Sequence, residues 1–146
     1  SFEAKVVKIV DGDTITALDA QNTTIKIRMY GIDAPESKQA FGQKAKQALT
    51  TAIATKIITV IDHGTDIYGR MLGTIWLDGY DINASMVDSG YAWVYRFEDN
   101  AIVPGYIKYE SAAQKEAKGL WADTNPVPPW QWRQANEKPR KVKEKK

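Results

Sequence analysis

The sequence contains no cysteine, one histidine and no apolar run long enough to span a membrane. The lack of cysteine excludes disulfides and thiolate metal sites, so the fold must be held by packing. It does not fix a compartment, although it suits an oxidising one. With 146 residues and 43% hydrophobic side chains, we expect one soluble domain with a sizeable core.

The basic residues are unevenly distributed along the chain. The net charge is only +2, but residues 138–146 carry six Lys/Arg and one Glu, which leaves 14 basic against 17 acidic residues in 1–137. We predict a folded domain over 1–121 and an extended C-terminal tail over 122–146, with a disordered basic end. A salt-dependent contact of that end with an anionic polymer is the alternative.

Five segments have the composition and alternation of β-strands, and the Asp-Gly pair at 11–12 predicts a tight hairpin between the first two. The third alternates clearly, with apolar side chains on one face and Lys26, Arg28 and Tyr30 on the other. The first three segments therefore suggest an antiparallel meander. The five predicted strands are 2–10, 13–18, 23–30, 56–61 and 70–77.

Three helices are expected between and after these strands. The first follows Ser37, its expected N-cap, and the second ends at Gly90. The third spans about 105–118 and is closed by Gly119. Because the prolines of "NPVPPW" cannot continue a helix, we expect extended chain after it. These elements predict an α+β fold, a five-stranded OB-fold-like β-barrel with three helices.

Three acidic residues are expected to meet at one end of this barrel. Asp13 begins the second strand, and Asp33 and Glu36 follow the third. Alone, each set is a turn or a favourable start to a helix. Together they form a cluster of like charges, which is costly unless something neutralises it, and a cation is the simplest neutraliser. Ligands that are all oxygen suit calcium or magnesium rather than zinc.

Two arginines, Arg28 and Arg70, belong to strands that reach the same region. Each alone could be a solvated strand residue. Beside a hard cation, however, guanidinium groups suit the charge that develops on a phosphodiester in its transition state. A carboxylate near the attacking water can take its proton. The combination therefore favours phosphodiester hydrolysis.

These residues lie in three blocks, "VDGDT", "IRMYGIDAPE" and "YGR", which resemble the signature blocks of the staphylococcal nuclease (thermonuclease) family. A looser similarity runs from about Ala4 to Trp121. The resemblance implies that Asp13 and Asp33 are calcium ligands. The third ligand would be the backbone carbonyl of Ala34, where family members often have threonine.

The resemblance also implies roles for other residues of these blocks and of the segment "YAWVY". Glu36 would be the general base, and Arg28 and Arg70 would bind the phosphate and stabilise the transition state. Tyr68 would contact the substrate. In "YAWVY", Trp93 and Tyr95 are the candidates for stacking on a base.

The tryptophans outside that segment are expected to fill the core rather than to bind bases. This expectation covers Trp76, Trp121, Trp130 and Trp132. Some family members have a lysine before the Tyr-Gly-Arg block, and this chain has Ile67 there.

The function implied is a calcium-dependent nuclease that cleaves DNA and RNA with little sequence preference and leaves 3′-phosphate ends. We expect a monomer without membrane contact, secreted or periplasmic, with a signal peptide already removed before Ser1. The alternative is a non-catalytic barrel of the same fold that binds nucleic acid or a peptide. Such degenerate copies usually lose a carboxylate or an arginine, whereas this chain keeps all five. A plain single-strand-binding barrel leaves the acids unexplained, because carboxylates repel phosphate.

Overall fold

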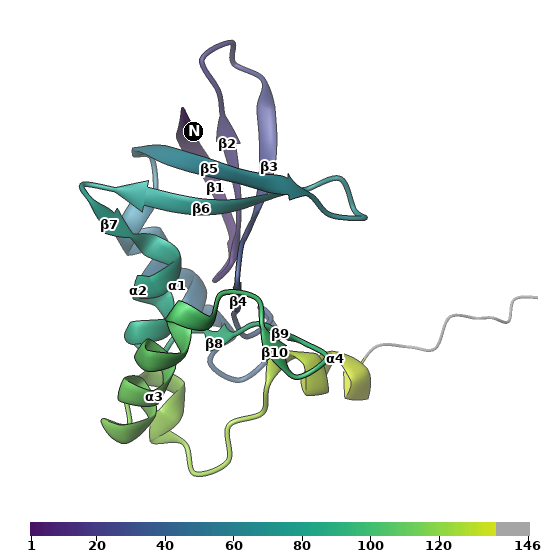
Figure 1. Ribbon diagram of the computed structural model, residues 1–146, viewed down its shortest axis with the longest axis vertical. Helices are drawn as coiled ribbons and strands as arrows, with labels where there is room; N and C mark the ends of the chain where they lie inside the picture. The colour runs from purple at the N-terminus through teal and green to yellow at the C-terminus, as the bar shows by residue number, and fades with distance from the viewer. Residues whose placement is uncertain (137–146) are drawn as a thin grey trace, which may run out of the picture.

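Five strands close into a barrel in the computed structural model of the chain, which describes residues 1–136 (Figure 1). They pair antiparallel in the order β3-β2-β1-β5-β6, and a parallel pairing of β3 with β6 closes the barrel. The five-stranded OB-fold-like barrel expected from the sequence is therefore confirmed. The strands are β1 (Phe2–Asp11), β2 (Thr14–Leu18), β3 (Thr24–Met29), β5 (Ile57–Thr65) and β6 (Met71–Leu77).

Shorter strands decorate the barrel and the chain that leaves it. β7 (Tyr80–Asp81) pairs with β6 at one edge of the sheet. β4 (Ile32–Asp33) pairs with β8 (Trp93–Val94), and β9 (Arg96–Phe97) pairs with β10 (Asn100–Ala101). The β4–β8 pairing brings the end of the third predicted strand beside the "YAWVY" segment.

The barrel is filled by the apolar faces of the alternating strands. In β3, Ile27 and Met29 are fully buried, and the polar residues between and before them face outward. Ile15 of β2, Val60 of β5 and Ile75 of β6 are also fully buried in the same cluster. At about 25 cal/mol per Å² of buried apolar surface, this core is the main source of stability.

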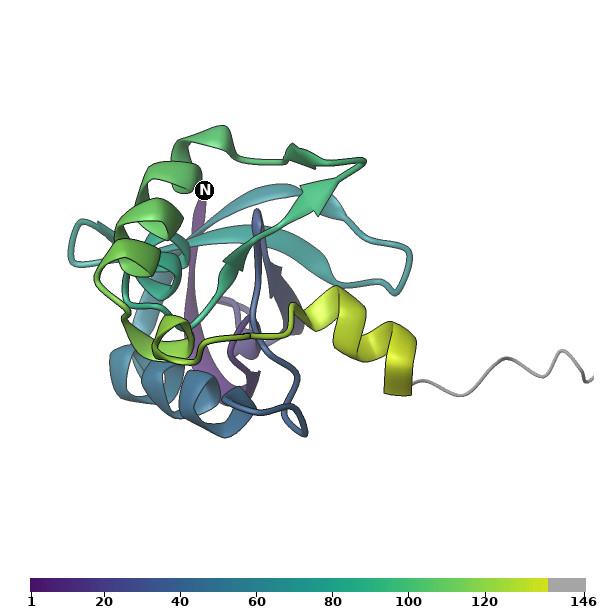
Figure 2. The same ribbon diagram turned by 90° about the horizontal axis from the view of Figure 1, so that it is seen from below.

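Four α-helices lie in the described residues, one more than the sequence analysis expected. In Figures 1 and 2, the first three gather on one side of the molecule and the fourth lies apart from them. Two 3₁₀ turns, η1 (Pro104–Tyr106) and η2 (Gly119–Ala122), flank the third helix. The helices are α1 (Gly42–Ile53), α2 (Ile82–Asp88), α3 (Ile107–Lys115) and α4 (Pro129–Asn136).

The start of α1 differs from the prediction. Phe41, with φ of 73°, occupies the N-cap position without a side-chain hydrogen bond, and Ser37 lies in the turns that precede the helix. The first helical residue, Gly42, packs against the carbonyl of Glu36, where any Cβ would clash. The residues after Glu36 therefore form a packed turn before the helix. The prediction that Ser37 is the N-cap was wrong.

The expectation of extended chain throughout 122–146 was also wrong, because residues 129–136 form α4. Proline is tolerated in the first turn of a helix, where the backbone N–H has no partner anyway. Pro129 begins α4 in this way. The basic end that the sequence analysis expected to be disordered lies outside the described residues.

One close backbone contact joins the ends of α2 and α3, and one buried side chain holds α2 to the barrel. Gly90 and Gly119 pack against each other with positive φ angles, and Leu120 donates its N–H to the Gly90 carbonyl at 2.8 Å. Both predicted helix stops, Gly90 and Gly119, therefore have left-handed φ angles. The buried Asn83 amide of α2 donates to the carbonyls of Tyr30 and Gly73, which fixes α2 against β6 and the end of β3.

No helix in the described part of the chain combines the length and apolar character needed to cross a bilayer.

Candidate active site

The predicted ligand residues Asp13 and Asp33 lie at the same end of the barrel, as the meander requires. Asp13 follows Gly12 in the turn between β1 and β2, where a Cβ on residue 12 would meet Ala45 at 2.8 Å and Ala34 at 2.9 Å. This tight packing sets Asp13 against the chain after β4. One oxygen of Asp13 accepts the Ala34 N–H at 2.8 Å, and the other accepts the hydroxyl of Thr14. The structure therefore brings Asp13, Asp33 and Ala34 together.

Arg28 joins the two carboxylates. Its Nη1 lies 3.4 Å from Asp13 Oδ2, and its Nη2 lies 3.4 Å from Asp33 Oδ1. Nη1 also donates to the carbonyls of Met29 and Ile32, which hold the guanidinium in place. Because Arg28 is on the predicted outward face of β3, it reaches this end of the barrel from the strand that leads into Asp33.

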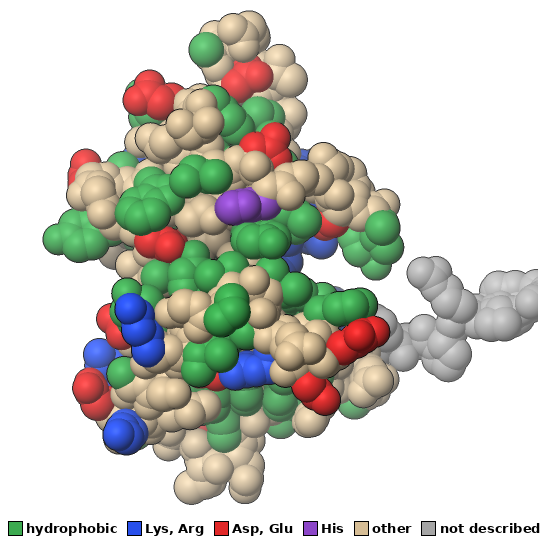
Figure 3. All heavy atoms as spheres, viewed as in Figure 1, with side chains coloured by type: hydrophobic (Ala, Val, Ile, Leu, Met, Phe, Trp, Pro, Cys, Tyr) green, Lys and Arg blue, Asp and Glu red, His purple; other side chains and the backbone are tan. Residues whose placement is uncertain are grey.

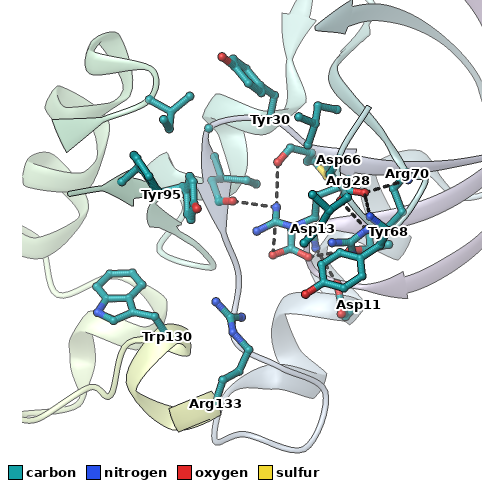
Figure 4. Close-up of a pocket in the computed structure, with 18 of the residues that line it drawn as sticks. Asp11, Asp13, Arg28, Tyr30, Asp66, Tyr68, Arg70, Tyr95, Trp130 and Arg133 are labelled. Carbon is teal, nitrogen blue, oxygen red and sulfur yellow. Dashed lines mark hydrogen bonds and ion pairs between the residues drawn. The ribbon is translucent and has the colours of Figure 1, made fainter. Parts of the chain in front are cut away.

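Arg70 lines a cleft of about 1050 Å³ together with Asp13, Arg28 and Glu36. Figure 4 shows it beside Asp66 and Tyr68 on the hairpin that joins β5 to β6. Arg70 Nε donates to Asp66 at 2.9 Å, and Asp66 also accepts the backbone N–H groups of Tyr68 and Arg70. These hydrogen bonds orient the arginine and leave its two terminal nitrogens available to a ligand.

Glu36 lines the cleft and keeps about a third of its side chain exposed. Its carboxylate accepts a hydrogen bond from Arg133, a residue of α4. Arg133 also binds Asp33, with Nη2 2.8 Å from Oδ2 and Nη1 3.3 Å from Oδ1. The predicted general base and one predicted metal ligand thus share one arginine.

Burial and neighbouring charges shift the pKa values of the acids in the site. Burial, with the charge of Asp13 next, raises the pKa of Asp11 to about 8, although Asp11 keeps some exposure. Burial also raises the pKa of Asp33, against the hydrogen bond from Arg133. Burial also tends to raise the pKa of Asp13, but the charge of Arg28 and hydrogen bonds hold this pKa below its usual value. Two guanidinium groups therefore neutralise this cluster only in part.

The chemistry of this cluster fits a hard divalent cation. Within residues 1–136, no three His, Asp or Glu side chains are arranged so that they could hold a metal ion as they stand, and Arg28 and Arg133 lie between the acids. The possible ligand atoms that converge on Arg28 are carboxylate oxygens of Asp13 and Asp33. A buried surplus of carboxylate charge favours calcium or magnesium over zinc.

The three predicted substrate residues occupy different surroundings. Tyr68 is largely exposed at the tip of its hairpin, and Tyr95 is half-buried on the opposite side of the cleft. Trp93 lies outside the cleft lining, where its ring packs edge-on against Trp121 at 4.5 Å and Trp130 at 5.4 Å between centroids. The structure therefore brings Tyr68 and Tyr95 to the cleft but not Trp93.

Trp130 combines packing with a position at the site. It contacts Trp93, as a core tryptophan would, and it also lines the cleft near Tyr95 (Figure 4). In Figure 3, Lys and Arg side chains are visible in the hollow between the barrel and the part of the molecule below it. The cleft thus has an aromatic wall and a charged floor.

Three charged residues of the site were missed by sequence reasoning. Asp11 was assigned only to the hairpin turn, although it precedes Asp13 by two residues in the first motif block. Asp66 precedes Arg70 by four residues, and this spacing could have suggested the pair. Arg133 carries no such signal, because it lies 100 residues from Asp33 in the sequence.

Comparison with known proteins agrees with this fold. The family model described as "Staphylococcal nuclease homologue" matches residues 26–123, which is more than half of the chain. The chain is 40% identical over 141 residues to "Protein ParB" of Escherichia coli, covering 90% of this chain and 79% of that protein. These matches show that the chain belongs to the staphylococcal nuclease homologue family.

Two further relatives bear names that refer to nuclease activity. A "Micrococcal nuclease" of Shigella flexneri is 39% identical over 144 residues, which are 92% of this chain and 82% of that protein. An "Uncharacterized endonuclease" of Haemophilus influenzae is 43% identical over 129 residues, with 88% and 71% covered. The similarity in each case extends over most of both chains.

Proposed function

We propose that this protein is a calcium-dependent nuclease that hydrolyses phosphodiester bonds of DNA and RNA with little sequence preference. The observation that carries the proposal is the meeting of Asp13 and Asp33, from separate strands, on the single guanidinium of Arg28. Family membership and the names of the relatives support phosphodiester hydrolysis as the reaction.

The residues that would hold the cation are Asp13, Asp33 and the backbone carbonyl of Ala34. Calcium bound there would screen the charge of the phosphate and lower the pKa of the attacking water. The carboxylates themselves would repel a phosphate, so their convergence in a nucleic-acid-binding cleft is understandable only with a cation partner.

The two arginines lie on the same side of the cleft (Figure 4), where both would act on the phosphate. Arg28 is held rigidly by two backbone carbonyls, and Arg70 is oriented by Asp66. Guanidinium groups fixed in this way need little reorganisation when charge builds on the phosphoryl oxygens, which is the condition for electrostatic catalysis. Their contribution is therefore expected in turnover more than in ground-state affinity.

Glu36 is the group placed to accept a proton from the water that attacks phosphorus. Its carboxylate is at the cleft and partly open to solvent. With 3′-phosphate products, the bond that breaks joins phosphorus to the 5′ oxygen, which leaves as a hydroxyl after taking up a proton. The hydroxyl of the water stays on phosphorus, and its proton passes to Glu36.

Tyr68 and Tyr95 would be substrate contacts, since they line the cleft on opposite sides. Contacts through ring faces and backbone charges tolerate any base, which agrees with little sequence preference. The monomeric state and a secreted or periplasmic location stay predictions.

The test is incubation of plasmid DNA and RNA with the purified chain in calcium, in magnesium and in chelator. We expect cleavage of both polymers in calcium, less in magnesium because of its stricter geometry, and none in chelator. The fragments should become substrates for a DNA polymerase only after phosphatase treatment, since their ends carry 3′-phosphate. Binding of both polymers without cleavage in any cation would instead support the non-catalytic barrel.

A further inference from the structure

Arg133 occupies the position from which the predicted metal ligand and the predicted base are both reached. It extends from α4 into the cleft (Figure 4) and donates to both oxygens of Asp33 and to Glu36. Asp33 is fully buried, and its two oxygens interact with Arg133 and Arg28 rather than with solvent.

A guanidinium that occupies both oxygens of Asp33 competes with a divalent cation for them. Both oxygens of Asp33 already accept from arginine, and a cation bound by Asp33 would lie next to the positive charge of Arg133. Glu36 in an ion pair with Arg133 is likewise a weaker acceptor for a proton from water. The contacts of Arg133 therefore compete with loading of the site by a cation.

The helix that carries Arg133 is lightly attached to the body. Of the eight residues of α4, only Pro129 is buried, and the last three are exposed. Apart from the contacts of Arg133, the attachment includes the edge-on contact of Trp130 with Trp93 and, just before α4, a hydrogen bond from the Gln39 amide to the Val127 carbonyl. A helix this short has little stability of its own, so its position depends on these few contacts.

We propose that Arg133 competes with the divalent cation for Asp33 and Glu36, so that α4 acts as a removable cap on the active site. Before the cation binds, Arg133 neutralises the buried acids. When the cation binds, Arg133 withdraws, and Glu36 becomes free to act as base. This inference rests on the proposed cation-dependent function, because the competitor is the same cation.

Competition of this kind lowers the apparent affinity for the cation by the fraction of molecules in which the site is open. Removing the side chain of Arg133 should therefore tighten calcium binding. For a site that is capped in nine molecules of ten or more, the dissociation constant should fall about ten-fold or more. The change should be seen in binding itself, without any substrate.

The experiment is isothermal titration of calcium into the wild type, Arg133→Gln and two comparison variants. Lys38→Gln removes the same charge two residues from Glu36, but Lys38 is exposed and makes no ion pair in the described residues. It should leave the dissociation constant within about two-fold of the wild type, since only a screened surface charge is lost. Trp130→Ala keeps the charge of Arg133 but loosens α4, and it should tighten calcium binding to an intermediate extent.

The outcomes separate this inference from the proposed function. Tighter binding in Arg133→Gln than in Lys38→Gln, with Trp130→Ala between wild type and Arg133→Gln, supports the competition. Equal or weaker binding in Arg133→Gln overturns the competition but leaves the cation site in place. Absence of calcium binding in both wild type and Arg133→Gln overturns the cation site and the competition together.

Discussion

At the scale of single residues, the site consists of acids and arginines that partly neutralise one another's charge. Arg28 stabilises the ionised form of Asp13, while Asp11 holds a proton because burial and Asp13 raise its pKa to about 8. The arginines are in turn fixed by carbonyls and carboxylates. Each functional side chain thus depends on a neighbouring group that fixes its position or its charge.

Replacing Glu36 by Gln should separate catalysis from cation binding. The amide cannot take a proton from water, so turnover should fall by roughly 10² to 10⁴, which is the usual contribution of a general base. The fold should be unchanged, because Glu36 is at the surface of the cleft. Initial rates of plasmid cleavage with saturating calcium are the measurement. Near-full activity of the variant would show that another group accepts the proton.

Asp66 should act only through Arg70, as a positioning residue. Asp66→Asn weakens the hydrogen bond to Arg70 Nε, so we expect turnover to fall about ten-fold with a smaller change in KM. In an Arg70→Ala background the same change should cost little more, since the two effects share one pathway. Asp62→Asn is the matched control, because Asp62 lies four residues before Asp66, in β5, and within residues 1–136 its side chain accepts only the Gly64 N–H. Additive losses from Asp66→Asn and Arg70→Ala would contradict the assignment.

At the scale of elements, the barrel positions the site and two glycines join the ends of α2 and α3. The turn before Asp13 packs against Ala34 and Ala45, so the β1–β2 hairpin and the start of α1 fix each other. Gly90, after α2, and Gly119, after α3, approach so closely that neither can carry a side chain. The segment between them includes β8 and Tyr95, and it forms one wall of the cleft.

Gly90→Ala should be strongly destabilising. Residue 90 has φ of +82°, and a Cβ there would lie 2.2 Å from the Lys118 carbonyl oxygen. Backbone strain and this clash together should lower the free energy of unfolding by about 2–4 kcal/mol. Gly79→Ala is the control, since residue 79 has nearly the same φ but open space around its Cβ, and it should cost roughly 1–2 kcal/mol. Urea denaturation would measure both, and equal costs would contradict the packing argument.

Much of this architecture could be predicted from the sequence, and the exceptions have physical causes. Alternation in residues 23–30 and the Asp-Gly turn were sufficient for the meander, because both are local signals. The helix α4 was missed because prolines that end one helix can also begin another. Ser37 was misassigned because the packing of Gly42 against Glu36, a tertiary contact, decides where α1 begins.

The site residues also fall into those that the sequence could predict and those that it could not. Asp13, Asp33, Arg28 and Arg70 sit at strand ends, so topology alone could place them together. Arg133 depends on how a distant segment folds back over the cleft, and nothing in the spacing of residues indicates it. Trp93 was misplaced relative to the cleft because its strand position does not reveal that Trp121 and Trp130 enclose it.

At the scale of the whole molecule, the buried acids link stability to pH. Asp11 holds its proton in the folded chain up to about pH 8, whereas in the unfolded chain it ionises near its ordinary pKa of 3.8. The folded state therefore binds more protons between these values, and stability falls as pH rises through that window. Asp33 acts in the same direction. Asp13, whose pKa is lowered, stabilises the folded state above its ordinary pKa, and this contribution is lost as the pH falls below about 4.

Asp11→Asn should reduce this dependence on pH. In chelator, the free energy of unfolding of the wild type should fall between about pH 4 and pH 8, by at most about 1.4 kcal/mol per pH unit for one group. The variant carries no ionisable group at residue 11, so its slope should be smaller, with the difference vanishing above about pH 8. Urea titrations at several pH values would measure this. Identical slopes would show that Asp11 is ionised in the folded chain at neutral pH.

The account depends on one arrangement, in which acids from separate segments bind one cation and arginines beside them bind one phosphate. A crystal structure with calcium and a short phosphorothioate oligonucleotide tests it most directly. We predict one calcium ion bound by Asp13, Asp33 and the Ala34 carbonyl, with Arg28 and Arg70 on the same phosphate and Arg133 moved away from Asp33. An oligonucleotide bound elsewhere, or calcium held by other residues while Arg133 stays on Asp33, would contradict the account.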